Sequence, residues 1–198
     1  MPESFQVLLG KPKLLWAVHQ LMEGDYFAAT VQALVYKGAK YGESLHWHQD
    51  PINIRRFPAF NMDIYLDKST IENGCVYVIP ESHLAGYHGK DPGFIEHWTG
   101  GKGIEAIAAV PVETNPGDVI FHATSVLHAS GKNKTSSSRR TIYYHFDRYE
   151  DVKLAKLSGD EWPWWRTEFP KAQKIMAKAI ELRSRVYSNE IPFPYKHI

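Results

Sequence analysis

The rest of the chain is best explained as a scaffold around one stretch, Leu45-His46-Trp47-His48-Gln49-Asp50. Side chains two positions apart on an extended strand leave the same face, so His48 and Asp50 can converge on one ion. Imidazole nitrogens and carboxylate oxygens are both metal ligands. A His-x-Asp triplet also fits a solvated His–Asp pair at a strand end, so downstream residues must decide between a metal site and an ordinary pair.

A second histidine would complete a set of two imidazoles and one carboxylate, the facial triad of non-heme Fe(II) oxygenases. Three ligands on one face of an ion leave three positions open, which a cosubstrate and O2 require. Two later segments, 119–122 and 126–131, each offer one histidine, His122 and His128. Both compete for the place of the third ligand.

Residues 60–67 (FNMDIYLD) alternate between apolar and polar side chains, which predicts a strand with one dry and one polar face. Asn61 and Asp63 lie on the polar face, which would meet water in an ordinary sandwich but can line a site in a barrel. The apolar run 27–36 is also a predicted strand, and Gln32 within it must either bond in the core or point into a pocket. Further strands are predicted at 75–80, 104–112, 119–122, 126–131 and 139–146.

Turn signals separate these strands, with Asn-Gly at 73–74 and Asn-Pro-Gly-Asp at 115–118. Helices are predicted at about 12–22 and 171–187, and the stretches 55–58 and 84–103 are predicted loops, the second of them over the site. Seven or eight short strands with a helix at each end predict a mainly β fold, an antiparallel barrel or jelly roll with helical buttresses. We expect a single domain over 1–198, with the helix at 12–22, a β core at about 27–146 and a helical extension at 150–198.

Composition excludes several classes of protein. The 23 basic and 22 acidic residues nearly balance, which gives no electrostatic footprint for nucleic acid or an anionic membrane. Cys75 is the one cysteine, so an internal disulfide framework is excluded and a reducing compartment is favoured. No apolar run is long enough to span a membrane, and the first twenty residues lack the pattern of a secretory signal. A cytoplasmic location is therefore expected.

Three motifs together resemble the phytanoyl-CoA dioxygenase family of Fe(II)/2-oxoglutarate-dependent oxygenases: HWHQD at 46–50, ENGCVYVIPESH at 72–83 and NPGDVIFHATSVLHASGKNKTSSSRRTIYYHF at 115–146. The resemblance runs in order from about Lys11 to Phe146. It implies a double-stranded β-helix, of the jelly-roll or cupin-like kind, with His48, Asp50 and His128 as iron ligands. Relatives are typically longer at the N-terminus.

The resemblance further implies that Arg139 holds the distal carboxylate of 2-oxoglutarate, with Ser130 beside it and Gln32 near the cosubstrate. An arginine suits this role because its planar fork meets a carboxylate with two hydrogen bonds. The Ala-Ser-Gly after His128 and the spacing to Arg139 favour His128 over His122 as a ligand. His122 is then expected to be a core residue or a neighbour of the ligands.

The chain is accordingly expected to oxidise a C–H bond of a small molecule, using Fe(II), 2-oxoglutarate and O2 and releasing succinate and CO2. Asp50 favours hydroxylation, because related halogenases carry Ala or Gly at that place. The candidates for substrate contact are Trp47, Asn61, Asp63 and the 84–103 loop. The alternatives are a barrel that binds a ligand without catalysis and a cupin-like metalloenzyme that does not use 2-oxoglutarate.

Overall fold

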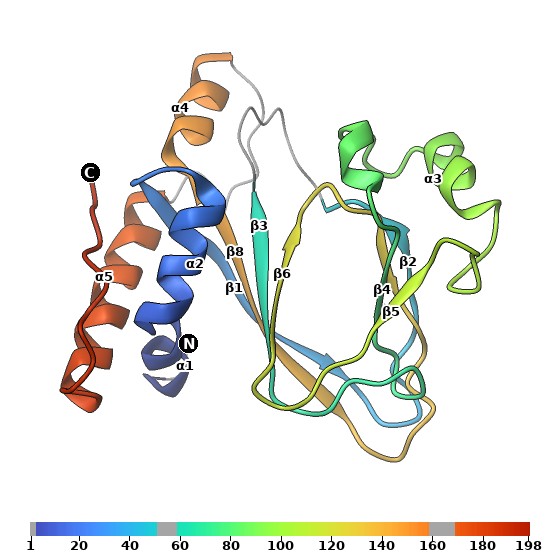
Figure 1. The fold of residues 1–198 in the computed structure, drawn as a ribbon, viewed down its shortest axis with the longest axis horizontal. Coiled ribbons are helices and arrows are strands. Elements are labelled where there is room, and N and C mark those ends of the chain that lie inside the picture. The colour runs from blue at the N-terminus through green and yellow to red at the C-terminus, as the bar shows by residue number, and fades with distance from the viewer. Residues whose placement is uncertain (1–2, 51–58, 159–168) are drawn as a thin grey trace. The chain divides into compact units, whose positions relative to one another are not determined.

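A computed structural model describes residues 3–50, 59–158 and 169–198 (Figure 1). The described residues fall into two compact units. The first comprises residues 3–32, 59–60, 144–158 and 169–198, and the second comprises residues 33–50 and 61–143. Strands β1 (Phe27–Lys37) and β8 (Arg139–Arg148) contribute residues to both units.

The strands form two four-stranded sheets, with the orders β1-β8-β3-β6 and β2-β7-β4-β5. The remaining strands are β2 (Leu45–His48), β3 (Phe60–Tyr65), β4 (Val76–Val78), β5 (Val110–Val112), β6 (Val119–Ala123) and β7 (His128–Ser130). The pairs β2–β7, β7–β4 and β4–β5 are all antiparallel. The prediction of a mainly β fold with antiparallel pairing and flanking helices is confirmed.

The helices of the first unit are α1 (Glu3–Leu9), α2 (Pro12–Met22), α4 (Tyr149–Ser158) and α5 (Phe169–Val186). Sequence reasoning found α2 and α5 but missed α1, which packs against α5. Gly10 follows α1, and a Cβ at this position would collide with the carbonyl oxygen of Ala179 on α5. A glycine is therefore required where the two segments meet.

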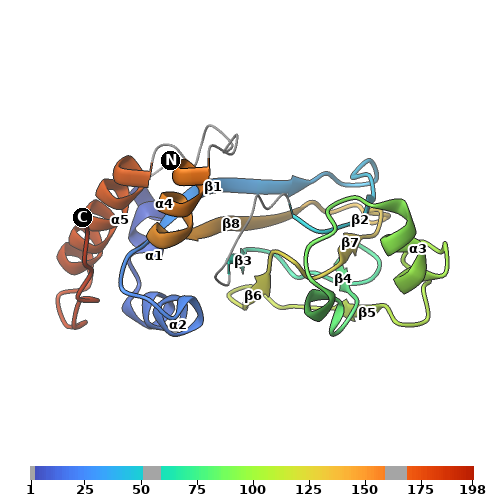
Figure 2. The ribbon, with the colours of Figure 1, turned by 90° about the horizontal axis from the view of Figure 1, so that it is seen from above.

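The second unit buries an apolar cluster made by the strands of the β2-β7-β4-β5 sheet and the turns beside them. Trp47, Leu127 and Ala129 belong to it, together with Cys75, Tyr77, Ile79 and Ala106. Helix α3 (Pro92–Thr99) lies beside this sheet (Figures 1 and 2), and its apolar side chains pack against the cluster. These contacts hold β2 and β7 in place, and those two strands carry the site.

The prediction of a loop without regular structure at 84–103 was wrong. A short 3-10 helix, Ser82–Ala85, precedes α3 in this stretch. The Asp91 carboxylate caps α3 by accepting a hydrogen bond from the Phe94 amide at 2.8 Å, Pro92 occupies the first turn, and Gly100 ends the helix at φ 63°. These start and stop signals were readable in the sequence.

The predicted strand at 104–112 is shorter in the structure, which has strand only at 110–112. Residues before it form turns, in which the Ala106 amide bonds the Gly103 carbonyl at 3.1 Å and the Ala109 amide bonds the Ala106 carbonyl at 2.9 Å. The predicted loop at 55–58 lies outside the described residues. Among the residues that are described, no helix is long and apolar enough to cross a membrane. The single-domain assignment stays a prediction.

Candidate metal centre

Strand register brings His48 and His128 together although they are far apart in the sequence. In the antiparallel β2–β7 pair, His48 lies directly opposite His128, after an irregularity in the register between Leu45 and His48. Directly opposed residues of an antiparallel pair point to the same face of the sheet. The two ring centroids are accordingly 4.2 Å apart.

The backbone sets the orientation of both rings. His48 Nδ1 lies 2.7 Å from the carbonyl oxygen of His46, and His128 Nδ1 lies 3.0 Å from that of Val126. A carbonyl oxygen can only accept, so each Nδ1 carries a proton and donates it. Each Nε2 is thereby left with its lone pair, which is the form in which a histidine binds a metal.

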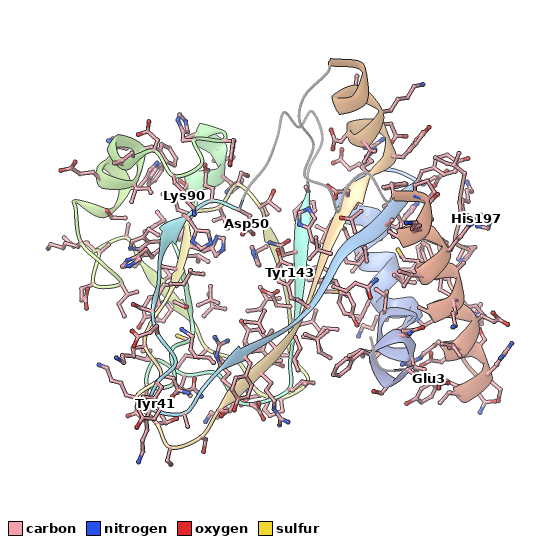
Figure 3. The ribbon with its side chains drawn as sticks, turned by 180° about the vertical axis from the view of Figure 1, so that it is seen from behind. Glu3, Tyr41, Asp50, Lys90, Tyr143 and His197 are labelled. Atoms are coloured by element: carbon pink, nitrogen blue, oxygen red, sulfur yellow. The ribbon has the colours of Figure 1, made fainter. Side chains whose placement is uncertain are left out.

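Asp50 completes the cluster just beyond the end of β2 (Figure 3). Its Oδ1 lies 3.8 Å from His48 Nε2 and 3.8 Å from His128 Nε2. The ligand atoms of the three side chains all lie within 4.8 Å of one another, as one ion shared among them requires. Within the described part of the chain, this is the only group of three or more such side chains with metal-binding spacing.

Electrostatics favour the ligand forms of these residues. Burial would raise the pKa of Asp50, but the neighbouring His122, His128 and His48 lower it well below its usual value. Burial, aided by repulsion from His122 and His48, lowers the pKa of His128 to about 4 despite the attraction of Asp50. At neutral pH, Asp50 is therefore ionised and His128 is neutral.

The other oxygen of Asp50 meets a second polar group. Asn61 Nδ2 donates a short hydrogen bond to Asp50 Oδ2 and also lies 2.9 Å from His122 Nε2. His122 Nδ1 lies 3.2 Å from Asp63 Oδ2. Burial lowers the pKa of His122, and attraction from Asp50 and Asp63 opposes this effect.

Gln49 anchors the backbone between His48 and Asp50, the two candidate ligands of the HWHQD stretch, a role that sequence reasoning missed. Its side chain is buried, and its Nε2 donates to the carbonyl oxygens of Gly86 at 2.8 Å and Ser125 at 2.5 Å. Its Oε1 accepts from the backbone amides of His88 and Gly89 at 2.6 and 3.0 Å. The end of β2 is thereby tied to two separate loops.

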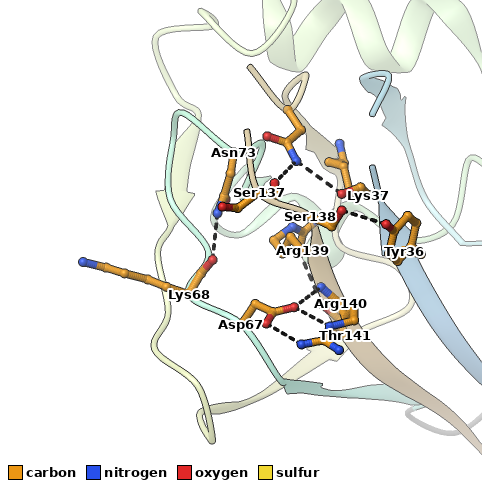
Figure 4. Close-up of polar contacts among 11 residues, drawn as sticks. Tyr36, Lys37, Asp67, Lys68, Asn73, Ser137, Ser138, Arg139, Arg140 and Thr141 are labelled. Carbon is orange, nitrogen blue, oxygen red and sulfur yellow. Dashed lines mark hydrogen bonds and ion pairs between the residues drawn. The ribbon is translucent and has the colours of Figure 1, made fainter. Parts of the chain in front are cut away.

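Arg139 is a buried cation without a carboxylate partner among the described residues. It is 4% exposed, its Nη1 donates weakly to Thr141 Oγ1 at 3.4 Å, and its Nε has no hydrogen-bond partner there (Figure 4). The next residue, Arg140, faces the other way and forms a two-pronged ion pair with Asp67 at 2.8 and 2.9 Å. Of these two neighbouring arginines, only Arg140 is neutralised by a carboxylate of the described residues.

Lys37 is a second buried cation of this region. Its Nζ donates to Ser130 Oγ at 2.8 Å and to the carbonyl oxygens of Gly131 at 2.5 Å and Glu43 at 3.0 Å. Burial, followed by repulsion from Arg139, lowers the pKa of Lys37 to about 8. Lys37 and Arg139 thus bond only to neutral groups among the described residues. Two buried cations in this setting favour the binding of an anionic ligand.

The other residues predicted from the sequence lie as follows. Trp47 is part of the apolar cluster, and its Nε1 donates to the Gly103 carbonyl at 2.9 Å. Gln32 belongs to the first unit and donates to the Ala29 carbonyl at 3.5 Å. Asn61 and Asp63 are buried beside Asp50 and His122. Contact of any of these residues with a substrate or cosubstrate stays a prediction.

The donor set fits the groups that the sequence resemblance implies. Two imidazoles and one carboxylate on one face suit Fe(II) with open positions. The unpartnered Nε of Arg139 suits one end of a dicarboxylate.

Comparison with known proteins places the chain among relatives of one family. A family model described as phytanoyl-CoA dioxygenase (PhyH) matches residues 3–141. A methylphosphonate hydroxylase from Gimesia maris is 33% identical over 158 residues, covering 78% of this chain and 53% of that protein. Human peroxisomal phytanoyl-CoA dioxygenase is 34% identical over 161 residues, covering 72% of this chain and 46% of that protein. The chain spans between 32% and 53% of the length of the curated relatives it matches.

Solved structures show the same likeness. The crystal structure of EvdMO1 is 34% identical and superposes with a TM-score of 0.59, covering 71% of this chain and 32% of that one. AviO1 from Streptomyces viridochromogenes is 30% identical with a TM-score of 0.58, covering 70% of this chain and 58% of that one. EctD from S. alaskensis with bound Fe, at 22% identity and a TM-score of 0.60, covers 76% of this chain and 54% of that one and is similar in fold.

Proposed function

Because the chain belongs to the phytanoyl-CoA dioxygenase (PhyH) family, we propose that it is an Fe(II)- and 2-oxoglutarate-dependent dioxygenase that hydroxylates a C–H bond of a small molecule. The reaction consumes O2 and 2-oxoglutarate, and one oxygen atom enters the product while the other enters succinate as CO2 leaves. The observation that carries this proposal is the convergence of His48, Asp50 and His128 on one point.

The residues of the chain would divide the work as follows. His48, Asp50 and His128 would hold the metal, and Arg139 would bind the distal carboxylate of 2-oxoglutarate. Ser130 lies at the end of β7 and is hydrogen-bonded to Lys37, which is consistent with a place beside that carboxylate. Bound Fe(II), with 2-oxoglutarate and O2, supplies the oxidant that attacks the C–H bond.

The packing around the ligands supports a rigid site. Trp47 precedes His48, and Leu127 and Ala129 flank His128. All three are buried in the apolar cluster on the side of the sheet opposite the ligands. The core therefore packs against one face of these strands, and His48 and His128 extend from the other face.

We also infer the finer fold, a double-stranded β-helix. The two four-stranded sheets, their non-consecutive strand orders and the antiparallel pairing support it. The similarity in fold to EctD, at a TM-score of 0.60, agrees with it.

Anaerobic titration tests the proposal directly. Fe(II) and then 2-oxoglutarate are added to the protein, and a metal-to-ligand charge-transfer band is expected in the visible spectrum. With O2 and a library of small molecules, succinate release and a substrate mass increased by one oxygen are expected. Asp50→Ala and His128→Ala should abolish both.

The outcomes separate the alternatives. A band that never forms would favour a barrel that binds a ligand without catalysis. Turnover that does not require 2-oxoglutarate and survives Arg139→Ala would instead indicate a cupin-like metalloenzyme. Full activity of Asp50→Ala would refute the ligand assignment.

A further inference from the structure

The two oxygens of Asp50 have different surroundings. Oδ1 faces the two ligand histidines, at 3.8 Å from each Nε2. Oδ2 is turned to the other side, where Asn61 Nδ2 donates to it and His122 Nε2 lies at 3.6 Å. One oxygen is thus available to an ion, and the other is already engaged by the protein.

Asn61 can link Asp50 to His122 because its amide nitrogen carries two protons. One proton is donated to Asp50 Oδ2, and the second can be donated to His122 Nε2 at 2.9 Å. Because an amide nitrogen can only donate, the contact at 2.9 Å places the lone pair of His122 on Nε2 and its proton on Nδ1.

Asp63 supplies the end of the chain of hydrogen bonds. Its Oδ2 lies 3.2 Å from His122 Nδ1 and, as a carboxylate, can only accept. It therefore fixes the proton of His122 on Nδ1. Asp63, Asn61 and His122 are all largely buried, with exposed fractions of 7% and 0% for the first two and 12% for the histidine side chain.

We propose that Asp63, His122 and Asn61 form a hydrogen-bonded relay that holds Asp50 as a one-oxygen metal ligand. These three are positioning residues for the metal centre, and the inference rests on the proposed function. With Oδ2 occupied, Asp50 cannot bind an ion through both oxygens, so one more coordination position stays open for the cosubstrate and O2. The relay differs from the earlier expectation that Asn61 and Asp63 contact the substrate.

Co(II) binding to the intact, metal-free protein tests the relay without catalysis. The visible spectrum of bound Co(II) reports both its affinity and its coordination number. His122→Phe removes both links of the histidine, and Asn61→Ala removes the link to Asp50 without changing a charge. We expect the Kd for Co(II) to rise about 10- to 100-fold in both variants, as is typical when the partner of a metal ligand is lost. We also expect the spectrum to change intensity as Asp50 becomes free to bind through both oxygens.

Two further variants sharpen the comparison. His122→Gln keeps one donor and one acceptor, and its Kd should lie closer to that of the wild type than the Kd of His122→Phe. His19→Phe is a matched control, because it removes an imidazole that pairs with Asp25 at 3.1 Å in the first unit, away from the metal ligands in sequence and in contacts. It should leave Co(II) binding unchanged.

The outcomes distinguish this inference from the function it rests on. Folded His122→Phe and Asn61→Ala proteins with wild-type Co(II) affinity and spectrum would overturn the relay while leaving the metal site intact. The same result joined to a raised KM for the substrate would return Asn61 to the role of substrate contact. If His122→Phe does not fold, Asn61→Ala decides alone. A wild-type protein that binds neither Co(II) nor Fe(II) would refute the proposed function itself.

Discussion

Replacing Arg139 with methionine should separate cosubstrate binding from stability. Arg139 is buried, its Nε has no partner among the described residues, and no carboxylate there forms an ion pair with it. Methionine keeps much of the apolar stem and removes the charge. The change therefore removes the donors for a carboxylate and also removes an unneutralised buried cation.

The magnitude follows from two hydrogen bonds. A guanidinium that meets a carboxylate with two charge-assisted bonds loses about 1.5 kcal/mol or more for each when it is removed. A total of about 3 kcal/mol corresponds to a rise of more than about 100-fold in the Kd for 2-oxoglutarate, since about 1.4 kcal/mol equals a factor of ten. The free protein should be at least as stable as the wild type, because burying an unpaired charge opposes folding.

Arg140→Met is the matched control on the same strand. Arg140 is half exposed and already paired with Asp67, so its loss should leave the Kd for 2-oxoglutarate unchanged. Binding is measured anaerobically from the charge-transfer band with Fe(II) present, and stability from denaturant unfolding of the metal-free protein. A Kd for Arg139→Met within threefold of the wild type, or an equal loss in Arg140→Met, would refute the assignment.

Two further predictions concern stability. Burial, followed by Arg139, lowers the pKa of Lys37 from 10.5 to about 8, so the unfolded chain binds more protons than the folded one between these values. The free energy of unfolding should gain from this group as the pH rises through that window, and urea unfolding at several pH values should show that Lys37→Met lacks the gain. Gly74 has φ 79°, and a Cβ there would collide with the Gly131 carbonyl, so Gly74→Ala should lower the free energy of unfolding by about 1–3 kcal/mol. Gly101→Ala, at φ 71° in open space, should lower it less, and equal losses would contradict the steric explanation.

Local patterns predicted much of the fold. The alternation over 60–67 identified β3, and the Asn-Gly pair at 73–74 marked the turn before β4, because both signals depend only on neighbouring residues. The caps of α3 are equally local, and Asp91, Pro92 and Gly100 show that the helix at 92–99 was readable from them. Because this helix is short, its apolar residues do not repeat with a clear helical period, and the sequence pattern did not reveal it.

The candidate site was less accessible to sequence reasoning because it depends on pairing between distant strands. The alignment of His48 opposite His128 requires the register of β2 against β7, which neither segment specifies alone. The polar face of Asn61 and Asp63 was predicted correctly, but its partner His122 comes from β6, which follows more than fifty residues later. The resemblance to a family, and not periodicity, supplied the choice of His128.

The hydrogen bonds that orient the rings of His48 and His128 have a practical consequence. Each ring is oriented by a carbonyl only two residues earlier in the chain, so the Nε2 lone pairs point the same way whichever cation arrives. Such a preset pair of imidazoles does not distinguish iron from nickel, cobalt or zinc, and the more avid late divalent ions compete for it. Protein purified over immobilised nickel should therefore be stripped with a chelator and reloaded without oxygen before its turnover is judged.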